Sequence, residues 1–318
     1  MEKNVGEYLW SQMYRPSKLD DVIIPASIKD RFKGYVRDGQ IQNLLLTSAS
    51  PGTGKTTTAF ALCNELGIRP LFINASLNNS IDEIRSNVLQ YATTVSLLGT
   101  GIKIVILDEA DRLTPAAQDS LKGLIETVSK NCRFILTANT KSRITDPLQS
   151  RCTNIEYAFS QDELKMIGAQ MFKRACEILD DQGINYSKPV IAQMVKKYQP
   201  DNRGLIEKLQ EYAVAHRIID EGILAQMASA SLDAVIGSMK EKRFDQVKQW
   251  CFDNQDRLTD EFYQKLFLKA EPLCEKPSVP ELVMILDEWQ TKHREVPDRF
   301  IHFLAMCTHI MMRVQFSA

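Results

Sequence analysis

The sequence predicts an α/β domain, in which helices cover both faces of a parallel sheet, followed by two helical domains. Four short apolar runs, each bounded by polar or turn residues, are typical of buried parallel strands; they occupy 43–49, 70–75, 103–110 and 132–139. Segments with helical periodicity lie between these runs. Strands that alternate with helices along a chain indicate a parallel sheet with helices on both of its faces.

The second half of the chain lacks this alternation. After about residue 158 the apolar residues recur at helical spacing, and they continue to do so in the tail from about Leu232. Breaks in the tail are expected near 254–260, 274–280 and 294–298. We therefore expect three domains: a nucleotide-binding domain over 1–158, a small helical lid domain over 159–230 and a helical collar domain over 231–318.

Composition limits the possible classes of function. The chain has 318 residues, is 44% apolar and 25% charged, and carries a formal net charge of −1, which is ordinary for a globular protein. Any contact with nucleic acid must therefore come from a local arrangement of basic side chains. The seven cysteines form no C-x-x-C pair, so neither a zinc ribbon nor a disulfide framework is indicated. The first ten residues lack the apolar core of a signal peptide, and we expect a soluble, cytoplasmic protein.

A glycine-rich loop between the first strand and a helix predicts a phosphate site. The stretch TSASPGTGKTTTAF, 47–60, satisfies the P-loop pattern except that Ala49 stands at its first glycine. Lys55 is expected to contact the β- and γ-phosphates of a nucleotide, and the Thr56 hydroxyl to bind Mg²⁺. The phosphate-binding residues predicted in this loop are Pro51, Gly52, Thr53, Gly54, Lys55, Thr56 and Thr57.

The strand at 103–107 ends in two acidic residues, Asp108 and Glu109. Ligands of parallel sheets bind at the carboxyl ends of the strands. We expect Asp108 to hold Mg²⁺, directly or through water, and Glu109 to orient or deprotonate the attacking water. An acidic strand end can also be merely solvated, but together with the P-loop these residues predict that the protein binds and hydrolyses a nucleoside triphosphate.

Several motifs resemble those of the AAA+ ATPases, and within them the clamp-loader subunits related to replication factor C. The matching stretches are MYRPSKLDDVIIP, DEAD, ILTANT, PLQSRC and DNRGLIEKLQ. Together they span about Tyr8 to Tyr212, and the chain's length and tail look most like the large subunits of T-even-type bacteriophage loaders. The chain departs from the family at Ala49 and in the segment Leu77 to Ser80.

The resemblance implies roles for further residues. The adenine pocket would be lined by Tyr14, Arg15, Pro16, Val22 and Ile23. Asn139 would hold the attacking water, although it can also be read as a turn asparagine. Arg203 follows two possible helix caps, and would reach the γ-phosphate of its own subunit from the lid rather than remain a solvated helix arginine.

Arg151, in the Ser-Arg-Cys motif, has no acidic residue near it in sequence. In the resembled family this arginine contacts the γ-phosphate held by the neighbouring subunit, where a guanidinium stabilises the transferring phosphoryl group. The alternative is a surface arginine in a salt bridge.

Two helices with well-marked starts are candidates for DNA contacts. Ser80 and Thr114 are expected to cap them, the latter with Pro115 at the first helical position. The resemblance places such helices along the phosphates of duplex DNA, and we predict contacts from Arg85, Gln118 and Lys122, unless these are ordinary solvated side chains. Leu97 and Leu98 are predicted to enter a groove of a sliding clamp, unless they are buried beneath their own loop.

The function that these features favour is that of an ATPase subunit in a sliding-clamp loader, acting with ATP and Mg²⁺. Its expected partners are further copies of itself, one different small subunit, a sliding clamp and primer-template DNA. Two alternatives remain open: an AAA+ DNA helicase or branch-migration motor, and a nucleotide-holding scaffold without catalysis. The helical tail argues against the first, and intact Lys55, Asp108, Glu109 and Arg151 argue against the second.

Overall fold

The chain forms two compact units, Met1–Ile219 and Asp220–Ala318. The computed structural model describes residues 6–77, 81–94, 102–229, 231–254, 260–293 and 296–317. None of the helices in these ranges combines the length and the apolar character needed to cross a lipid bilayer.

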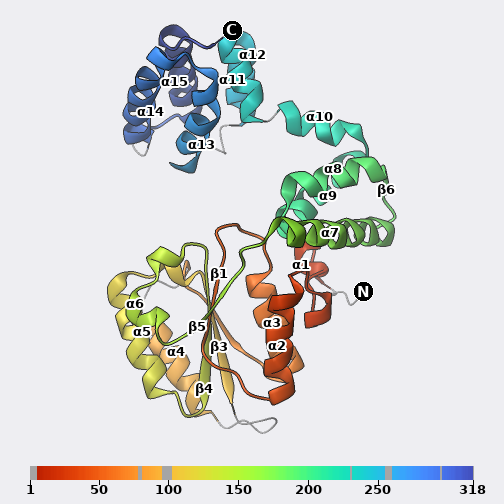
Figure 1. Cartoon of the computed structure of the whole chain (residues 1–318), viewed down its shortest axis with the longest axis vertical. Helices are drawn as coiled ribbons and strands as arrows, with labels where there is room; N and C mark the ends of the chain where they lie inside the picture. Colours follow the sequence, from red (N-terminus) through yellow and green to blue (C-terminus); the bar gives the residue numbers. More distant parts are fainter. Residues whose placement is uncertain are drawn as a thin grey trace. The chain divides into compact units, whose positions relative to one another are not determined.

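A five-stranded parallel sheet forms the centre of the first unit (Figure 1). Its order is β2-β3-β4-β1-β5, with the strands β1 (Leu44–Thr47), β2 (Leu71–Asn74), β3 (Lys103–Asp108), β4 (Cys132–Ala138) and β5 (Thr153–Glu156). The four strands predicted from the sequence are all present. Because β4 lies between β1 and β3, the segments that follow these three strands meet at one edge of the sheet.

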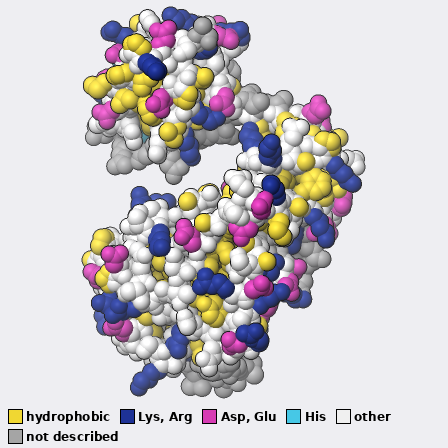
Figure 2. Space-filling model, viewed as in Figure 1, with side chains coloured by type: hydrophobic (Ala, Val, Ile, Leu, Met, Phe, Trp, Pro, Cys, Tyr) yellow, Lys and Arg dark blue, Asp and Glu magenta, His cyan; other side chains and the backbone are white. Residues whose placement is uncertain are grey.

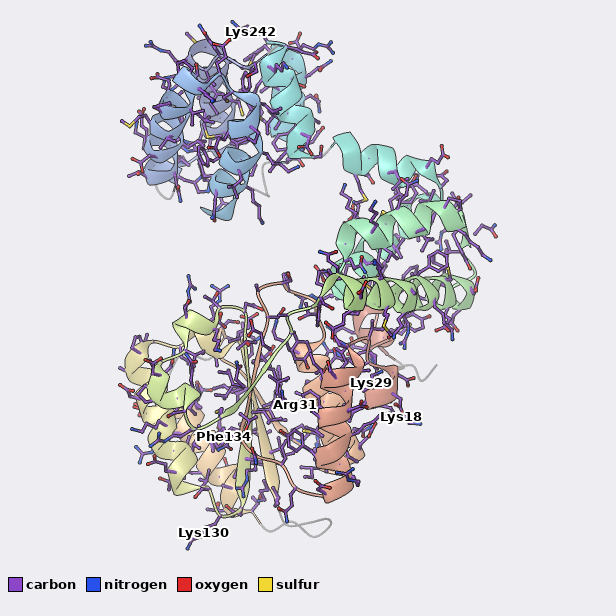
Figure 3. All side chains as sticks on the ribbon, in the orientation of Figure 1. Lys18, Lys29, Arg31, Lys130, Phe134 and Lys242 are labelled. Atoms are coloured by element: carbon purple, nitrogen blue, oxygen red, sulfur yellow. The ribbon has the colours of Figure 1, made fainter. Side chains whose placement is uncertain are left out.

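Helices cover both faces of the sheet, which confirms the predicted α/β class (Figure 1). One layer holds α2 (Ala26–Asp38) and α3 (Lys55–Glu65), and the other holds α4 (Ile81–Thr93), α5 (Pro115–Thr127) and α6 (Asp146–Gln149). Each face of the sheet has its own core, and residues of β3 alternate between them. Ile104 and Ile106 belong to the first core, beneath α2 and α3, and Val105 and Leu107 belong to the second, beneath α4 and α5. Figure 3 places Phe134 in the sheet, where it is buried in the second core.

Local sequence determines where these helices begin and end. The Thr114 hydroxyl accepts the Ala117 N–H at 3.3 Å and Pro115 follows it, so the predicted start of α5 is confirmed. Helix α2 ends at Gly39, whose φ of 63° lies in the left-handed region that glycine adopts without strain. Short 3₁₀ segments connect the larger elements: η1 (Leu19–Asp21), η2 (Ala110–Arg112), η3 (Lys141–Arg143), η5 (Glu271–Leu273) and η6 (Lys276–Ser278).

Three helices follow the sheet within the same unit: α7 (Gln161–Asp181), α8 (Lys188–Tyr198) and α9 (Asn202–His216). A capping box between Ser160 and Glu163 begins α7. Two short parallel strands, β6 (Asn185–Tyr186) and β7 (Ile218–Ile219), also lie here. The sequence analysis missed these strands because two residues are too few to show a periodicity.

The N-terminal segment is fixed to α9. Its short helix α1 (Trp10–Met13) packs on α9, and the Trp10 N–H donates to Gln210 Oε1 at 2.8 Å. The Gln210 amide in turn donates to the Tyr8 carbonyl at 2.9 Å. Gln210 is buried, and its hydrogen bond with the Trp10 N–H is shielded from water.

The second unit is helical, as predicted. Its helices are α10 (Glu221–Ser229), α11 (Leu232–Lys240), α12 (Phe244–Asp253), α13 (Asp260–Ala270), α14 (Val279–Lys292) and α15 (Arg299–Arg313). The predicted break near 274–280 separates α13 from α14. Aromatic contacts among Trp250, Phe262 and Phe303 form the centre of its core.

Candidate active site

A cavity of about 460 Å³ lies at the carboxyl edge of the sheet and brings most of the predicted site residues together. From the predicted set, it is lined by Tyr14, Arg15, Pro16, Val22, Ile23, Pro51, Gly52, Thr53, Gly54, Lys55, Thr56, Thr57, Asp108, Glu109, Asn139 and Arg203. The loops after β1, β3 and β4, the N-terminal segment and α9 all contribute to it. The volume is within the range of small-molecule sites.

The P-loop has the conformation that its glycines permit. Gly52 and Gly54 have φ of 64° and 94°, and Gly54 directly precedes α3. Among the described residues, positive φ outside glycine occurs at Glu109, Arg217 and Lys242, so Ala49 does not require the glycine that it replaces. The start of α3 therefore points its backbone N–H groups into the cavity, as phosphate binding requires.

The polar groups of Thr53 and Lys55 could bind an anion in the cavity. The Thr53 hydroxyl is buried and has no hydrogen-bond partner among the described residues. The Lys55 ammonium donates to Asn139 Oδ1 at 2.9 Å and to the Ser50 carbonyl at 3.5 Å. Burial lowers the pKa of Lys55, while the Asp108 carboxylate acts to raise it. A phosphate in the cavity would supply both residues with a charged acceptor.

The residues expected to bind Mg²⁺ lie together. Thr56 Oγ1 donates to Asp108 Oδ1 at 2.6 Å, across the gap between α3 and β3. A hydroxyl and one carboxylate are oxygen ligands of the kind Mg²⁺ prefers, and magnesium sites of this class are completed by phosphate oxygens and water. Among the described residues, no group of three or more His, Cys, Asp or Glu is arranged so that it could hold a metal ion by itself. The donor set thus fits a metal that arrives with a nucleotide.

Glu109 leaves the strand in an unusual conformation. Its φ of 56° and ψ of 43° are left-handed, a region that residues other than glycine seldom adopt. Its N–H donates to Thr137 Oγ1 at 3.1 Å, and the same hydroxyl donates to Asp108 Oδ1 at 2.7 Å. Glu109 is half-buried and lines the cavity.

Asn139 follows β4 and is positioned by the last residue of the DEAD motif. The buried Asp111 carboxylate accepts the Asn139 and Thr140 N–H groups at 3.3 and 3.1 Å. These bonds fix the backbone at Asn139, and its side chain meets Lys55 as described above. The asparagine therefore lies between the loops that follow β1 and β3.

The lid helix α9 touches the P-loop directly. Asp201 caps α9 by accepting the Gly204 N–H at 2.9 Å, and the next residue, Asn202, donates its N–H to the Gly52 carbonyl at 3.2 Å. A methyl group at Gly52 would lie 1.6 Å from Asp201 Oδ1, so a larger residue would displace the carboxylate that caps α9. Arg203 is exposed on the first turn of α9 and lines the cavity.

The predicted adenine-pocket residues form the wall of the cavity contributed by the N-terminal segment. Tyr14 is buried, and its hydroxyl bonds to Asp181 and Gln182 at the end of α7. Burial and the contact with Asp181 raise the pKa of Tyr14 to about 12. The Arg15 guanidinium lies 5.8 Å from the centre of the Phe60 ring, a cation–π distance.

Arg151 is outside the cavity and is paired within its own chain. Its Nε and Nη2 donate to Glu126 Oε1 at 2.7 and 2.6 Å, and Glu126 comes from the last turn of α5. The side chain remains 34% exposed. The salt bridge named as the alternative in the sequence analysis therefore exists in the single chain, and its acidic partner is 25 residues away in sequence.

The structure corrects the prediction that Gln118 contacts DNA. Its side chain is 1% exposed, and its amide donates to the carbonyls of Leu113 and Arg143 and accepts the Thr145 N–H. These bonds use its donors and its acceptor to join α5 to the loop before α6. A group so enclosed cannot reach a nucleic acid backbone.

The other DNA candidates have accessible side chains. Arg85 is exposed on α4 and Lys122 is half-buried on α5. Figure 2 shows Lys and Arg interspersed with Asp and Glu on the face in view, in keeping with the near-zero net charge. The clamp candidates Leu97 and Leu98, and the predicted cap Ser80, lie outside the described residues.

The sequence analysis missed several residues that line the cavity: Ser11, Gln12, Phe72, Asn74, Thr137, Arg174, Asn202 and Ile206. A signal existed for Thr137, because a polar residue two positions before Asn139 interrupts an apolar strand. Arg174 lies in the middle of α7, where local sequence gives no indication of a site.

Comparison with known proteins finds two family models that match consecutive parts of the chain. The family model of the ATPase family associated with various cellular activities (AAA) matches residues 45–159. The model of the sliding-clamp-loader large subunit, AAA+ ATPase lid domain, matches residues 162–225.

Relatives extend this match over most of the chain. The sliding-clamp-loader large subunit of Enterobacteria phage T4 is 38% identical over 77% of this chain and 77% of its own length. The replication factor C small subunit of Archaeoglobus fulgidus is 36% identical over 70% of this chain and 69% of its own. The RuvB Holliday junction branch migration motor of Thermotoga maritima shares the fold, with a TM-score of 0.53 at 21% identity over 72% of this chain and 80% of that one. The chain thus belongs to the sliding-clamp-loader large subunits, a family of AAA+ ATPases.

Proposed function

We propose that this ATPase subunit of a sliding-clamp loader uses ATP binding to open a sliding clamp and place it on primer-template DNA, and uses hydrolysis to release it. The observation that carries the proposal is that the cavity of one chain contains all but one of the residues predicted to act in hydrolysis. Lys55, Asp108, Glu109 and Arg203 line one cavity, whereas Arg151 lies outside it. A site divided in this way supports hydrolysis that depends on assembly.

Within one subunit, each residue has a separate task in the proposed reaction. Lys55 would exchange its hydrogen bond with Asn139 for the terminal phosphates, which frees the Asn139 amide to hold the attacking water. Thr56 and Asp108 would hold Mg²⁺, whose charge offsets that of the phosphates. Glu109 would take the proton of the water.

The two arginines would contact nucleotides bound to different subunits. Arg203 would contact the γ-phosphate of its own subunit, and the Asn202 to Gly52 hydrogen bond supports a coupling between nucleotide and lid. Arg151 would contact the γ-phosphate held by the neighbouring subunit. An arginine supplied in this way contributes about 10³- to 10⁵-fold to the rate in other phosphoryl-transfer enzymes.

The proposed partners are further copies of this chain, one different small subunit, a sliding clamp and primer-template DNA. Arg85 and Lys122 remain the candidate DNA contacts, and Leu97 and Leu98 the candidate clamp contacts. The proposed division into a nucleotide domain (1–158), a lid (159–230) and a collar (231–318) assigns assembly to the collar. The proposed place of action is the cytoplasm, that of the host cell if a phage encodes the chain.

One measurement separates the loader from a branch-migration motor, whose similarity to this chain shows the fold alone. ATP turnover with primer-template DNA is measured with and without the sliding clamp. A loader requires the clamp for maximal stimulation, whereas a motor on DNA reaches its maximum without it. Equal turnover in the two conditions would contradict the proposal.

A second measurement tests the shared site. Arg151→Ala subunits are mixed with Lys55→Ala subunits, each of which disables a different part of the same site. Mixed assemblies should regain part of the turnover that neither variant has alone. If no turnover returns, Arg151 does not act on the neighbour's nucleotide.

A further inference from the structure

We propose that Thr137 is a positioning residue for hydrolysis, because its hydroxyl fixes Asp108 and Glu109 in the arrangement that the reaction needs. The inference deepens the proposed function and rests on the roles that it gives to these two acidic residues. Thr137 lies on β4, is 2% exposed and lines the cavity.

The Thr137 hydroxyl donates one hydrogen bond and accepts another, and its two partners are consecutive residues. Its proton is donated to Asp108 Oδ1 at 2.7 Å, and its oxygen accepts the Glu109 N–H at 3.1 Å. Buried hydroxyls that are fully used in this way restrict the groups they bind. One side chain on β4 therefore holds both acidic residues that end β3.

The bond to Glu109 matters because the chain must turn away from the sheet there. Leu107 faces the core beneath α4 and α5, and in a continued strand Glu109 would face the same apolar core. Its left-handed conformation, at φ 56°, breaks this alternation. Beyond the last β3–β4 pair, Leu107 with Leu136, the Thr137 hydroxyl provides the acceptor for the Glu109 N–H. The turn that lets Glu109 line the cavity is thus held by Thr137.

The bond to Asp108 matters because the other donor has a second task. Asp108 Oδ1 also accepts the Thr56 hydroxyl at 2.6 Å. In the proposed function the Thr56 hydroxyl oxygen would also bind Mg²⁺, so the position of this donor would depend on the bound metal. Thr137 is then the donor that keeps the Asp108 carboxylate in its orientation.

The test is Thr137→Val, which preserves the shape of the side chain and removes the hydroxyl. We expect kcat of the clamp- and DNA-stimulated assembly to fall about 10- to 100-fold, the range that small misplacements of reacting groups produce. The dissociation constant for ATP should change less than about threefold, since the P-loop is untouched. Thr137→Ser restores the hydroxyl and should return most of kcat. If the valine variant is too unstable to purify, Thr137→Ala is measured with the same expectation.

A matched control and a double-mutant cycle exclude a merely structural effect. Thr47→Val removes an equally buried hydroxyl from the neighbouring strand β1, where it bonds to Asn154, and should leave kcat within about twofold. In a Glu109→Gln background, Thr137→Val should reduce the residual turnover by a smaller factor than in the wild type, because the turn then carries no base and only the contact with Asp108 is lost.

The outcomes distinguish this inference from the function on which it rests. If Glu109→Gln keeps wild-type turnover, the proposed base is wrong. If Glu109→Gln abolishes turnover while Thr137→Val retains wild-type kcat, the role of Thr137 alone is refuted. A loss of ATP affinity as large as the loss of kcat would likewise overturn the inference, because Thr137 would then act in binding.

Discussion

Arg151 and Glu126 form an ion pair in which two guanidinium nitrogens share one carboxylate oxygen, at 2.6 and 2.7 Å. The pair joins the segment before β5 to the last turn of α5. In the proposed function, Arg151 must give up this carboxylate to reach a neighbour's phosphate. The strength of the pair therefore sets the cost of engaging the arginine.

Glu126→Gln should raise Arg151-dependent turnover by no more than about fivefold. Exposed ion pairs contribute ~0.2–1 kcal/mol, and the upper value corresponds to about a fivefold change in an equilibrium. Turnover of the assembly at increasing salt is the measurement. Glu288→Gln, which breaks the exposed pair with Lys292, is the matched control and should have no effect. A large loss of turnover in Glu126→Gln would mean that the carboxylate assists the arginine instead.

Gly52→Ala should weaken ATP binding about tenfold or more. The new methyl group would collide with Asp201 and displace α9 from the P-loop, and overpacking of this kind costs about 1–3 kcal/mol. Gly39→Ala is the control, because Gly39 has nearly the same φ, 63° against 64°, but open space around it. Both variants carry the strain of a left-handed alanine, so a loss of ATP affinity confined to Gly52→Ala is not a general effect of that strain on the fold. Equal affinities would show that the contact is irrelevant to nucleotide binding.

Lys122→Ala and Arg85→Ala should each reduce the salt dependence of DNA binding. A contact with one phosphate contributes about 0.9 to the slope of log affinity against log salt concentration. Binding to primer-template DNA is measured over a series of salt concentrations. Lys130, exposed in the turn after α5 and labelled in Figure 3, is the control, and Lys130→Ala should leave the slope unchanged. An unchanged slope in the first two variants would remove these residues from the DNA surface.

Acidification should destabilise the second unit through His302. Burial lowers the pKa of His302, as do His293 and Lys292, while the Trp289 carbonyl acts against them. Because the unfolded histidine, with a pKa of about 6.5, binds the proton more readily, stability is full above that pH and is lost as the pH falls through it toward the folded value. The melting temperature should thus be lower at about pH 5.5 than at about pH 7.5. His302→Gln should reduce this difference, whereas replacing His216, which is exposed on α9, should not.

The parts of the site that the sequence predicted are those encoded locally. The glycines and Lys55 have fixed spacing within one loop, and Asp108 and Glu109 end a single apolar strand. Contacts made by packing were not predictable in this way: Glu126 meets Arg151 only because α5 packs on α6. Thr137 meets Asp108 only through the register of two strands.

The error at Gln118 has a different origin. A glutamine near a helix start was expected to face solvent, but Gln118 lies three residues before Leu121 and seven before Ile125, both of which are buried. This spacing places it on the apolar face of α5. The helical periodicity therefore contained the information that the residue type obscured.

The attachment of the N-terminal segment to α9 through Gln210 has a mechanical consequence. The start of the wall that would hold the base of the nucleotide is hydrogen-bonded directly to the helix that carries Arg203. A rotation of the lid would pull on both at once, so recognition at one end of the nucleotide and sensing at the other would rise and fall together. A change in the binding of the base would then alter the contact of Arg203 with the terminal phosphate through α9, a path that does not include the strands.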